Sequence, residues 1–224
     1  MKQLQLIKRT IVAAVLSTGI APVAFAAGME DIDFELKAGT LGLGGEINYA
    51  MSPIFTVGLG LNTFTQNLTS TESDIEYDVD FKLQTIALLG SYHPFSGVFR
   101  FTGGLMLNGN ELSMTAKPIG TYDIGGTTYT AAQAGTLKST VEFNPIAPYL
   151  GLGWGKSAGR GFGVTCDLGI LFQGKPKVSM TASGTLANDP TFVAKLKAEE
   201  ADAADGLKDY TMHPVISLGF NYRI

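Results

Sequence analysis

The chain has 224 residues but only one cysteine, Cys166, and two histidines. A single cysteine excludes an intrachain disulfide and a cysteine-rich metal site, and we expect Cys166 to act as a small apolar residue. Beyond its first residues the chain has no long uncharged apolar segment. This excludes a helical membrane protein, because each spanning helix needs about 20 apolar residues. The chain is nevertheless 45% hydrophobic and contains 28 glycines, totals that suit either a secreted β-sandwich or a membrane β-barrel.

Residues 1–26 have the three parts of a secretory signal peptide. A basic start is followed by an apolar run at 11–20 and by the small-x-small sequence Ala24-Phe25-Ala26. The apolar run is too short to cross a bilayer comfortably, although an uncleaved membrane anchor is the alternative. We therefore predict a signal peptide over 1–26 and an exported β-barrel domain over 27–224.

Basic residues are scarce in the exported part. Residues 1–26 hold three basic residues and no acidic one, so the remainder has 13 Lys and Arg against 20 Asp and Glu, a formal net charge of −7. A nucleic-acid partner requires a basic face that neutralises phosphates. The charge balance therefore argues against nucleic acid as a partner.

Several segments alternate between apolar residues and small or polar residues. A membrane-spanning strand needs about 9–11 such residues, with apolar side chains facing lipid and the others facing the lumen. The alternating segments cover residues 55–62, 76–84, 99–108, 162–173 and 216–224. A soluble β-sandwich would show the same period of two, because successive side chains leave opposite faces of any strand.

Glycine at the polar positions favours the barrel over the sandwich. Glycine weakens a water-exposed strand, whereas on the lumen face of a small barrel it makes room in a narrow interior. Aromatic residues near the segment ends also suit the girdles of a membrane barrel. These aromatic residues are Tyr49, Phe64, Tyr77, Tyr92, Trp154, Phe172 and Tyr222.

The lengths of the connections predict the number of strands. Short connections lie at 51–53, 93–97 and 155–161, and long ones lie near 67–75, 116–138 and 176–209. Outer-membrane barrels have an even number of strands, short periplasmic turns and long extracellular loops. This rule predicts eight antiparallel strands if residues 32–50 form two strands that reverse within the glycine-rich stretch 39–45. A single kinked strand there is the alternative.

Three features interrupt the strand pattern. In the segment 143–148 the apolar residues change from odd to even numbers, which predicts a β-bulge at its prolines. Residues 121–129 predict a hairpin around Gly125-Gly126. In the last long loop Asp189 can cap a short helix that starts at Pro190 and stops at Gly206. Its apolar face, Phe192, Val193 and Leu196, would cover the barrel mouth or pack on loop 116–138.

Charged residues of both signs occupy lumen positions of the predicted strands. They are Glu35, Lys37, Glu46, Lys82, Arg100, Glu142, Asp167 and Arg223. The predicted lumen charge network comprises Glu46, Lys82, Arg100, Glu142, Asp167 and Arg223. Because isolated buried charges are very costly, we expect ion pairs that plug the interior; the functional alternative is a constriction that guides a small charged or zwitterionic solute.

The chain does not show the machinery of an enzymatic barrel. A membrane acyl hydrolase needs a base beside a nucleophilic hydroxyl. The histidines, His93 and His213, fall at opposite ends of the predicted barrel. No metal cluster, phosphate-binding loop or nucleotide motif stands out, so we expect no enzyme activity and no cofactor.

Two sets of residues resemble known outer-membrane proteins. The last residues, Ser217-Leu218-Gly219-Phe220-Asn221-Tyr222-Arg223-Ile224, resemble the signal read by the barrel assembly machinery, in which Gly219, Tyr222 and Ile224 match the pattern and Ile224 replaces the usual aromatic. The segments Pro148-Tyr149-Leu150-Gly151-Leu152-Gly153, Gly174-Lys175-Pro176 and Pro214-Val215 resemble CarO-type small porins, and the glycine-rich start resembles OmpW-type barrels.

The resemblance covers mainly the second half of the chain and implies a function. It implies passive uptake of small solutes, basic amino acids in the CarO case, and it carries over no site residues. We therefore predict a passive channel or facilitator in the outer membrane of a Gram-negative bacterium, in contact with outer-membrane lipid, lipopolysaccharide and the assembly machinery. The alternative is a non-conducting structural or adhesive barrel.

Overall fold

The computed structural model describes residues 32–72, 75–118, 120–155 and 161–224. The predicted signal peptide, 1–26, lies outside these residues.

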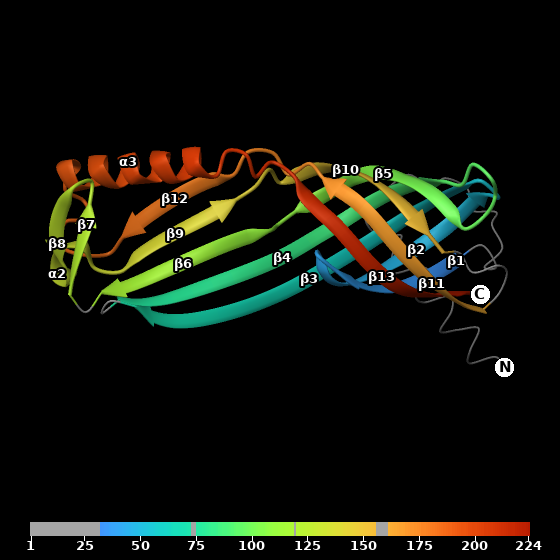
Figure 1. Ribbon diagram of the computed structural model, residues 1–224, viewed down its shortest axis with the longest axis horizontal. Coiled ribbons are helices and arrows are strands. Elements are labelled where there is room, and N and C mark those ends of the chain that lie inside the picture. Colours follow the sequence, from blue (N-terminus) through green and yellow to red (C-terminus); the bar gives the residue numbers. More distant parts are fainter. Residues whose placement is uncertain (1–31, 73–74, 119, 156–160) are drawn as a thin grey trace, which may run out of the picture.

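Eight antiparallel strands close into a ring (Figure 1). In ring order they are β4 (Ile75–Tyr92), β3 (Phe55–Glu72), β2 (Gly42–Ser52), β1 (Ile32–Gly39), β13 (His213–Arg223), β11 (Gly161–Leu171), β10 (Ile146–Trp154) and β5 (Phe99–Asn108). Pairing of β4 with β5 closes the ring. The predicted eight-stranded antiparallel barrel is confirmed as a fold, and residues 32–50 do form two strands.

The turn between β1 and β2 is tied to the last strand. Gly39 pairs with Gly42, whose positive φ of 96° suits glycine. The Thr40 hydroxyl donates to the Pro214 carbonyl (2.8 Å) and accepts from the Ile216 N–H (3.1 Å). The side chain of Leu41 is 5% exposed, so this short turn also contributes to the barrel interior.

On one side the sheet continues far beyond the ring. Strands β6 (Glu111–Pro118), β9 (Leu137–Glu142) and β12 (Lys177–Ala182) add to the far half of β4, in the order β3-β4-β6-β9-β12. We call β6, β9 and β12, with residues 63–72 of β3 and 75–84 of β4, the extension. The long loop predicted near 67–75 is wrong, because most of that segment lies in the paired strands β3 and β4.

A cap covers the end of the extension farthest from the C-terminus (Figure 1). It contains β7 (Thr121–Ile124), β8 (Thr127–Thr130), the single turn α2 (Ala131–Ala134) and α3 (Pro190–Gly206). The predicted hairpin and helix are both confirmed: Gly125 and Gly126 have positive φ, and the Asp189 carboxylate accepts from the N–H groups of Thr191 and Phe192 at 2.9 Å.

Helix α3 packs on the hairpin, one of the two positions expected for it. Phe192 and Leu196 are buried with Ile124 and Tyr129, and the rings of Phe192 and Tyr129 meet edge to face. The helix also protects the free edge of β12, because the Glu200 carboxylate accepts the Met180 N–H at 2.9 Å. Covering an edge in this way prevents pairing with other chains.

The bulge predicted in segment 143–148 is wrong. The pairs Glu111↔Glu142 and Leu107↔Ile146 keep one register across the gap between β9 and β10. The one-residue irregularity lies in residues 172–176 instead. Leu171 pairs with Tyr149 and Lys177 pairs with Glu142, so the stretch from 171 to 177 is one residue shorter than the stretch from 142 to 149 that it faces. The apolar residues therefore shift from odd to even positions because they lie on the inward face in β9 and on the outward face in β10.

Candidate functional site: a closed barrel interior

The outer surface of the ring is apolar on every strand. Large apolar side chains point outward and remain exposed, including Leu36 (72%), Leu61 (59%), Leu105 (54%), Leu150 (61%), Phe162 (86%) and Phe220 (71%). Near the end where the C-terminus lies, Tyr92, Trp154 and Tyr222 are exposed aromatic residues of this belt. A soluble protein rarely exposes so large a contiguous apolar surface.

In the extension the same faces carry the opposite chemistry. Leu83, Thr85, Ala87, Leu89 and Ser91 of β4 point into the ring and are buried. Strand β4 keeps its register with β3, β5 and β6 along its whole length. Because alternate residues share a face, the odd-numbered apolar residues of 75–84 lie on the same inward face. The outward face there is polar.

Apolar residues of the inward face support the cap. Tyr77 of β4, Leu137 of β9, and Met180 and Ala182 of β12 pack against the buried cluster that contains Phe192 and Leu196. The aromatic pair Phe64 and Phe81 lies on this face too, with ring centroids 6.4 Å apart. Phe64 and Tyr77 are therefore not members of an outward girdle, which corrects the prediction for these two residues.

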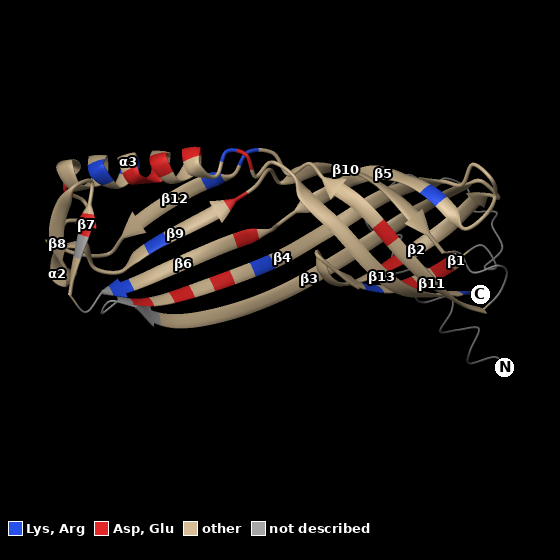
Figure 2. Cartoon of the chain, in the orientation of Figure 1, with Lys and Arg blue, Asp and Glu red and all other residues tan. Residues whose placement is uncertain are grey.

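Charged residues are frequent along the strands of the extension (Figure 2), and the cross-strand pairs place those of β4 and β6 on its outward face. Lys117 of β6 pairs with Glu76 (2.9 Å) and Asp78 (2.6 Å) of β4. The hydrogen bonds that Lys117 and Thr69 donate to the Asp78 carboxylate lower its pKa. Paired charges on this face are typical of a sheet surface that meets water.

Two members of the predicted lumen network lie outside the lumen. Lys82 and Glu142 are exposed, and both point outward from the extension, where Lys82 pairs across strands with Glu111 and Glu142 with Lys177. Their placement in the lumen was wrong because alternation shows which residues share a face but not which face is enclosed.

The other predicted charges meet inside the ring. Lys37 Nζ lies 2.5 Å from Glu46 Oε2 and 4.0 Å from Asp167 Oδ2, and Arg100 Nη2 lies 2.5 Å from Asp167 Oδ1. Arg100 Nη1 also donates to the Gly155 carbonyl at 2.8 Å. We call Lys37, Glu46, Arg100 and Asp167 the ion-pair layer. Its pairing and hydrogen bonds make charges tolerable in a narrow interior.

Further polar side chains lie between the ion-pair layer and the C-terminal end of the ring. The Thr165 hydroxyl donates to Glu35, and the Asn221 amide donates to Asp33 at 2.5 Å. Arg223, the last predicted member of the network, lines a cavity here together with Asp33 and Glu35. The interior is therefore polar from its C-terminal end up to the ion-pair layer.

Inward-facing glycines provide the space for these side chains. A Cβ added at Gly60 would lie 3.1 Å from the Glu46 carboxylate, and one at Gly153 would overlap both Arg100 and Asp167. A Cβ at Gly151 or Gly169 would overlap the ring of Tyr149. The glycine-rich pattern of the sequence is thus required by the bulk of a few large lumen residues.

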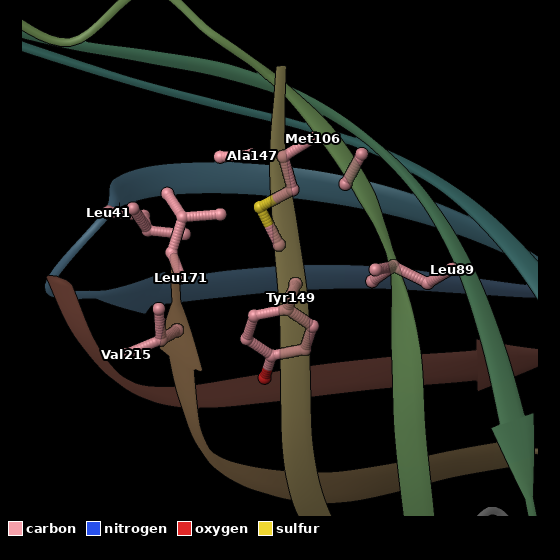
Figure 3. Close-up of a cluster of buried hydrophobic side chains, with 8 residues drawn as sticks. Leu41, Leu89, Met106, Ala147, Tyr149, Leu171 and Val215 are labelled. Atoms are coloured by element: carbon pink, nitrogen blue, oxygen red, sulfur yellow. The ribbon is translucent and has the colours of Figure 1, made fainter. Parts of the chain in front are cut away.

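An apolar layer closes the interior on the other side of the ion-pair layer. It consists of Leu41, Ala87, Leu89, Met106, Ala147, Tyr149, Leu171 and Val215. Figure 3 shows these side chains pointing toward one another from several strands, with Tyr149 in their midst. Leu171 and Ala147 have no exposed surface. Sequence reasoning missed this layer, because its members are apolar residues scattered over five strands and one turn.

The space that remains inside the ring is small. A cavity of about 30 Å³ lies at the boundary of the apolar and ion-pair layers, and a cavity of about 60 Å³ lies on the C-terminal side. Both are lined by Glu46, Ser91 and Arg100, so they adjoin. Such volumes hold a few water molecules and not a passing solute.

The predicted assembly residues lie at the end of β13. Gly219 faces inward, where an added Cβ would lie 2.6 Å from Glu35 Oε1, and Tyr222 faces outward with 44% of its surface exposed. The Ile224 N–H donates to the Ile32 carbonyl at 3.2 Å. Their role as an assembly signal stays a prediction.

The two histidines lie far apart, as their sequence positions predict. The ring of His93 is buried at the turn after β4, near the Gly97 carbonyl, and His213 Nε2 lies 3.2 Å from the Thr40 carbonyl at the start of β13. The residues that the structure describes contain no cluster of three or more potential metal ligands. Within the same residues, no helix has the length and apolar character of a membrane span.

These features define an eight-stranded antiparallel β-barrel with an apolar outer surface and a filled interior. No protein-family model matches the chain, and a search of curated proteins finds no relative.

Solved structures with this fold come from Acinetobacter baumannii. CarO2 aligns with a TM-score of 0.57 and 20% identity over 86% of this chain and 98% of its own. CarO aligns with a TM-score of 0.54 and 21% identity over 87% of this chain and 97% of its own. The resemblance to the CarO type that the sequence indicated is confirmed at the level of the fold.

Proposed function

We propose that the protein is an outer-membrane β-barrel of a Gram-negative bacterium that lets small solutes through an interior closed by a hydrophobic gate. The apolar belt on all eight strands supports the membrane setting, because in a membrane barrel such a surface contacts lipid tails. The polar outward face of the extension supports an orientation in which the extension lies in water outside the membrane. The start of β1 and the end of β13 then lie on the periplasmic side.

The observation that supports a hydrophobic gate is the arrangement of the barrel interior in polar and apolar layers. Polar and charged side chains line the barrel from Asp33 and Arg223 to the ion-pair layer, and a single apolar layer separates them from the other end. Hydrophobic constrictions can close an aqueous path by excluding water. A passing amino acid would bring a carboxylate and an ammonium, which the ion-pair layer can accept with its own charges of both signs.

A second candidate is a non-conducting barrel with a structural or adhesive role. The observation that favours it is the filling of the interior, since the lumen cavities measure only about 30 and 60 Å³. In this case the ion pairs would act only as packing, and the extension and its cap would be the functional surface.

Conductance and swelling measurements on refolded protein separate the two candidates. We expect wild-type protein in liposomes to permit swelling with glycine or arginine, while planar bilayers show no steady open current. The double variant Met106→Ala, Tyr149→Ala removes the largest side chains of the apolar layer and should give a steady current and faster swelling. Leu150→Ala, beside Tyr149 but facing outward, is the matched control and should behave like wild type.

The opposite result identifies the closed barrel. If wild-type liposomes swell no faster than protein-free ones and the double variant carries no current, the gate proposal is wrong. Circular dichroism of each refolded variant shows that the strands have formed.

A further inference from the structure

A third cavity lies beyond the apolar layer, at the base of the extension, and it is much larger than those in the lumen. Its volume is about 360 Å³, within the range of roughly 300–1,000 Å³ typical of small-molecule sites. One wall is the inward face of the extension, with Phe81, Leu112 and Val141; the opposite wall includes Tyr210 and Met212 of the segment between α3 and β13.

The walls of this cavity are apolar side chains that the fold leaves exposed. Phe81 is 37%, Leu112 38% and Met212 55% exposed. The cap buries the inward face of the extension farther out, around Phe192, whereas segment 207–214 lies over this part of the face and leaves these side chains partly exposed. An alkyl chain in the cavity would remove this surface from water.

One polar group in the cavity wall has an unused donor. Asn110 is 5% exposed, and its Oδ1 accepts the Gln84 N–H at 3.0 Å. Because a backbone N–H can only donate, this bond fixes which side-chain atom is the oxygen. Asn110 Nδ2 is buried and has no hydrogen-bond partner among the described residues. Buried donors normally have a partner, so the cavity offers a hydrogen bond to an acceptor oxygen.

The charge of the lining selects a neutral acceptor. Among the described residues that line the cavity, none is a lysine or an arginine. An anionic head group would therefore be buried there without a basic partner, which is costly, whereas a neutral carbonyl oxygen needs only one hydrogen-bond donor. The combination of apolar walls, one free donor and the lack of a lysine or arginine in the described lining fits an uncharged acyl compound.

We propose that this cavity binds an acyl ester, whose carbonyl oxygen accepts from Asn110 Nδ2 and whose alkyl chain lies against Phe81, Leu112 and Met212. The site is separate from the ion-pair layer and does not depend on solute passage through the gate. The ester can be a free small molecule or an acyl chain of a membrane lipid, and the experiment has one arm for each source.

Photolabelling of the refolded mature chain in lipid nanodiscs tests the site. In the first arm the probe is a methyl alkanoate with a diazirine in its chain, compared with an alkane that carries the same diazirine. In the second arm the probe is a phosphatidylcholine with a diazirine in one acyl chain. We expect labels on Leu112 or Met212, mapped by peptide mass spectrometry. Labels in the first arm identify a free small-molecule ester as the ligand, and labels in the second arm identify a lipid acyl chain.

Asn110→Asp tests the hydrogen bond, because it keeps the Oδ1 acceptor for the Gln84 N–H and replaces the Nδ2 donor by an oxygen. At pH 8 we expect the ester to lose roughly 3- to 10-fold in labelling affinity, as for one hydrogen bond, while the alkane is unaffected. Equal losses for ester and alkane would show that no carbonyl is recognised, and the proposal would then be wrong.

Leu112→Trp tests the cavity itself by filling it, and it does not rely on Asn110. It should abolish labelling of Met212 by either ester probe. Leu105→Trp, on the outward face of the ring, is the matched control and should leave that labelling unchanged. Labels confined to outward residues such as Leu105, in wild type and variants alike, would overturn the proposal.

Discussion

The two halves of strand β4 turn opposite chemistry toward the same side of the sheet. In the ring, Thr85 and Ser91 point inward while Ile86 and Leu88 are exposed outside. In the extension, Phe81 points inward while Asp80 and Lys82 point outward. The register of the strand does not change between the halves, and the proposed surroundings, lipid outside the ring and water outside the extension, account for the difference.

This comparison explains how one continuous strand can serve both regions. A sheet in water hides its apolar face, and in the extension the cap and the cavity segment lie over that face. A barrel in lipid exposes its apolar face and encloses its polar one. The apolar residues of the strand change face between Lys82 and Ile86, which is where the strand leaves the lipid in the proposed membrane setting.

The largest expected effect loosens the cap on the extension while leaving the ring intact. Phe192→Ala removes a side chain with 1% exposure that joins α3 to the hairpin, and core truncations of this kind cost about 3–5 kcal/mol. We expect amide hydrogen exchange to accelerate in α3 and β7–β8 but not in β10 or β11. Lys197→Ala, exposed on the same helix, should change neither; faster exchange throughout the ring would show that the two regions are not independent.

The second prediction places one charge on the outward face of each region. Leu150→Arg puts a guanidinium on the apolar belt, where a charge near the membrane midplane costs about 2–4 kcal/mol. Asn67→Arg puts it on the outward face of the extension, opposite Asp80, and should cost almost nothing. Urea titration of both variants in lipid bilayers measures the difference, and similar free energies of unfolding would contradict the assignment of lipid and water to the two faces.

The smallest expected effect compares the two faces of the ring itself. A Cβ at the inward Gly151 would overlap the Tyr149 hydroxyl and lie 2.9 Å from the Leu168 carbonyl, so Gly151→Ala should cost about 1–3 kcal/mol as an overpacked core does. At the outward Gly103 the nearest atom would be Leu150 Cδ2 at 3.3 Å, and Gly103→Ala should stay within about 0.5 kcal/mol. The same urea titration applies, and Tyr149→Phe should partly restore the Gly151→Ala variant.

Local patterns in the sequence were sufficient to predict most secondary-structure elements and much of their order along the chain. The alternation in 216–224, the Gly39–Gly45 reversal, the Gly125-Gly126 hairpin and the Asp189-Pro190 start of α3 all depend on neighbours within a few residues, and the structure contains each of them. The meeting of Glu46, Arg100 and Asp167 followed from their shared phase on strands that a closed ring brings together.

The alternation pattern could not predict the roles of residues whose surroundings come from distant strands. Lys82 and Glu142 have the same alternation as lumen residues, but they lie past the point where the sheet leaves the ring. The apolar layer around Tyr149 combines one or two residues from each of five strands with Leu41 of a turn. The cavity beside Asn110 forms only when segment 207–214 lies over the extension.

The amino-acid sequence by itself determined that this chain forms strands with one apolar face and one polar or glycine-rich face, because alternation with period two is a property of neighbouring residues. Tertiary structure alone decided which face is enclosed at each height, where the interior is closed, and which charges pair there. Those outcomes depend on the closure of the ring and on what surrounds each level of the sheet, and neither is encoded within a single strand.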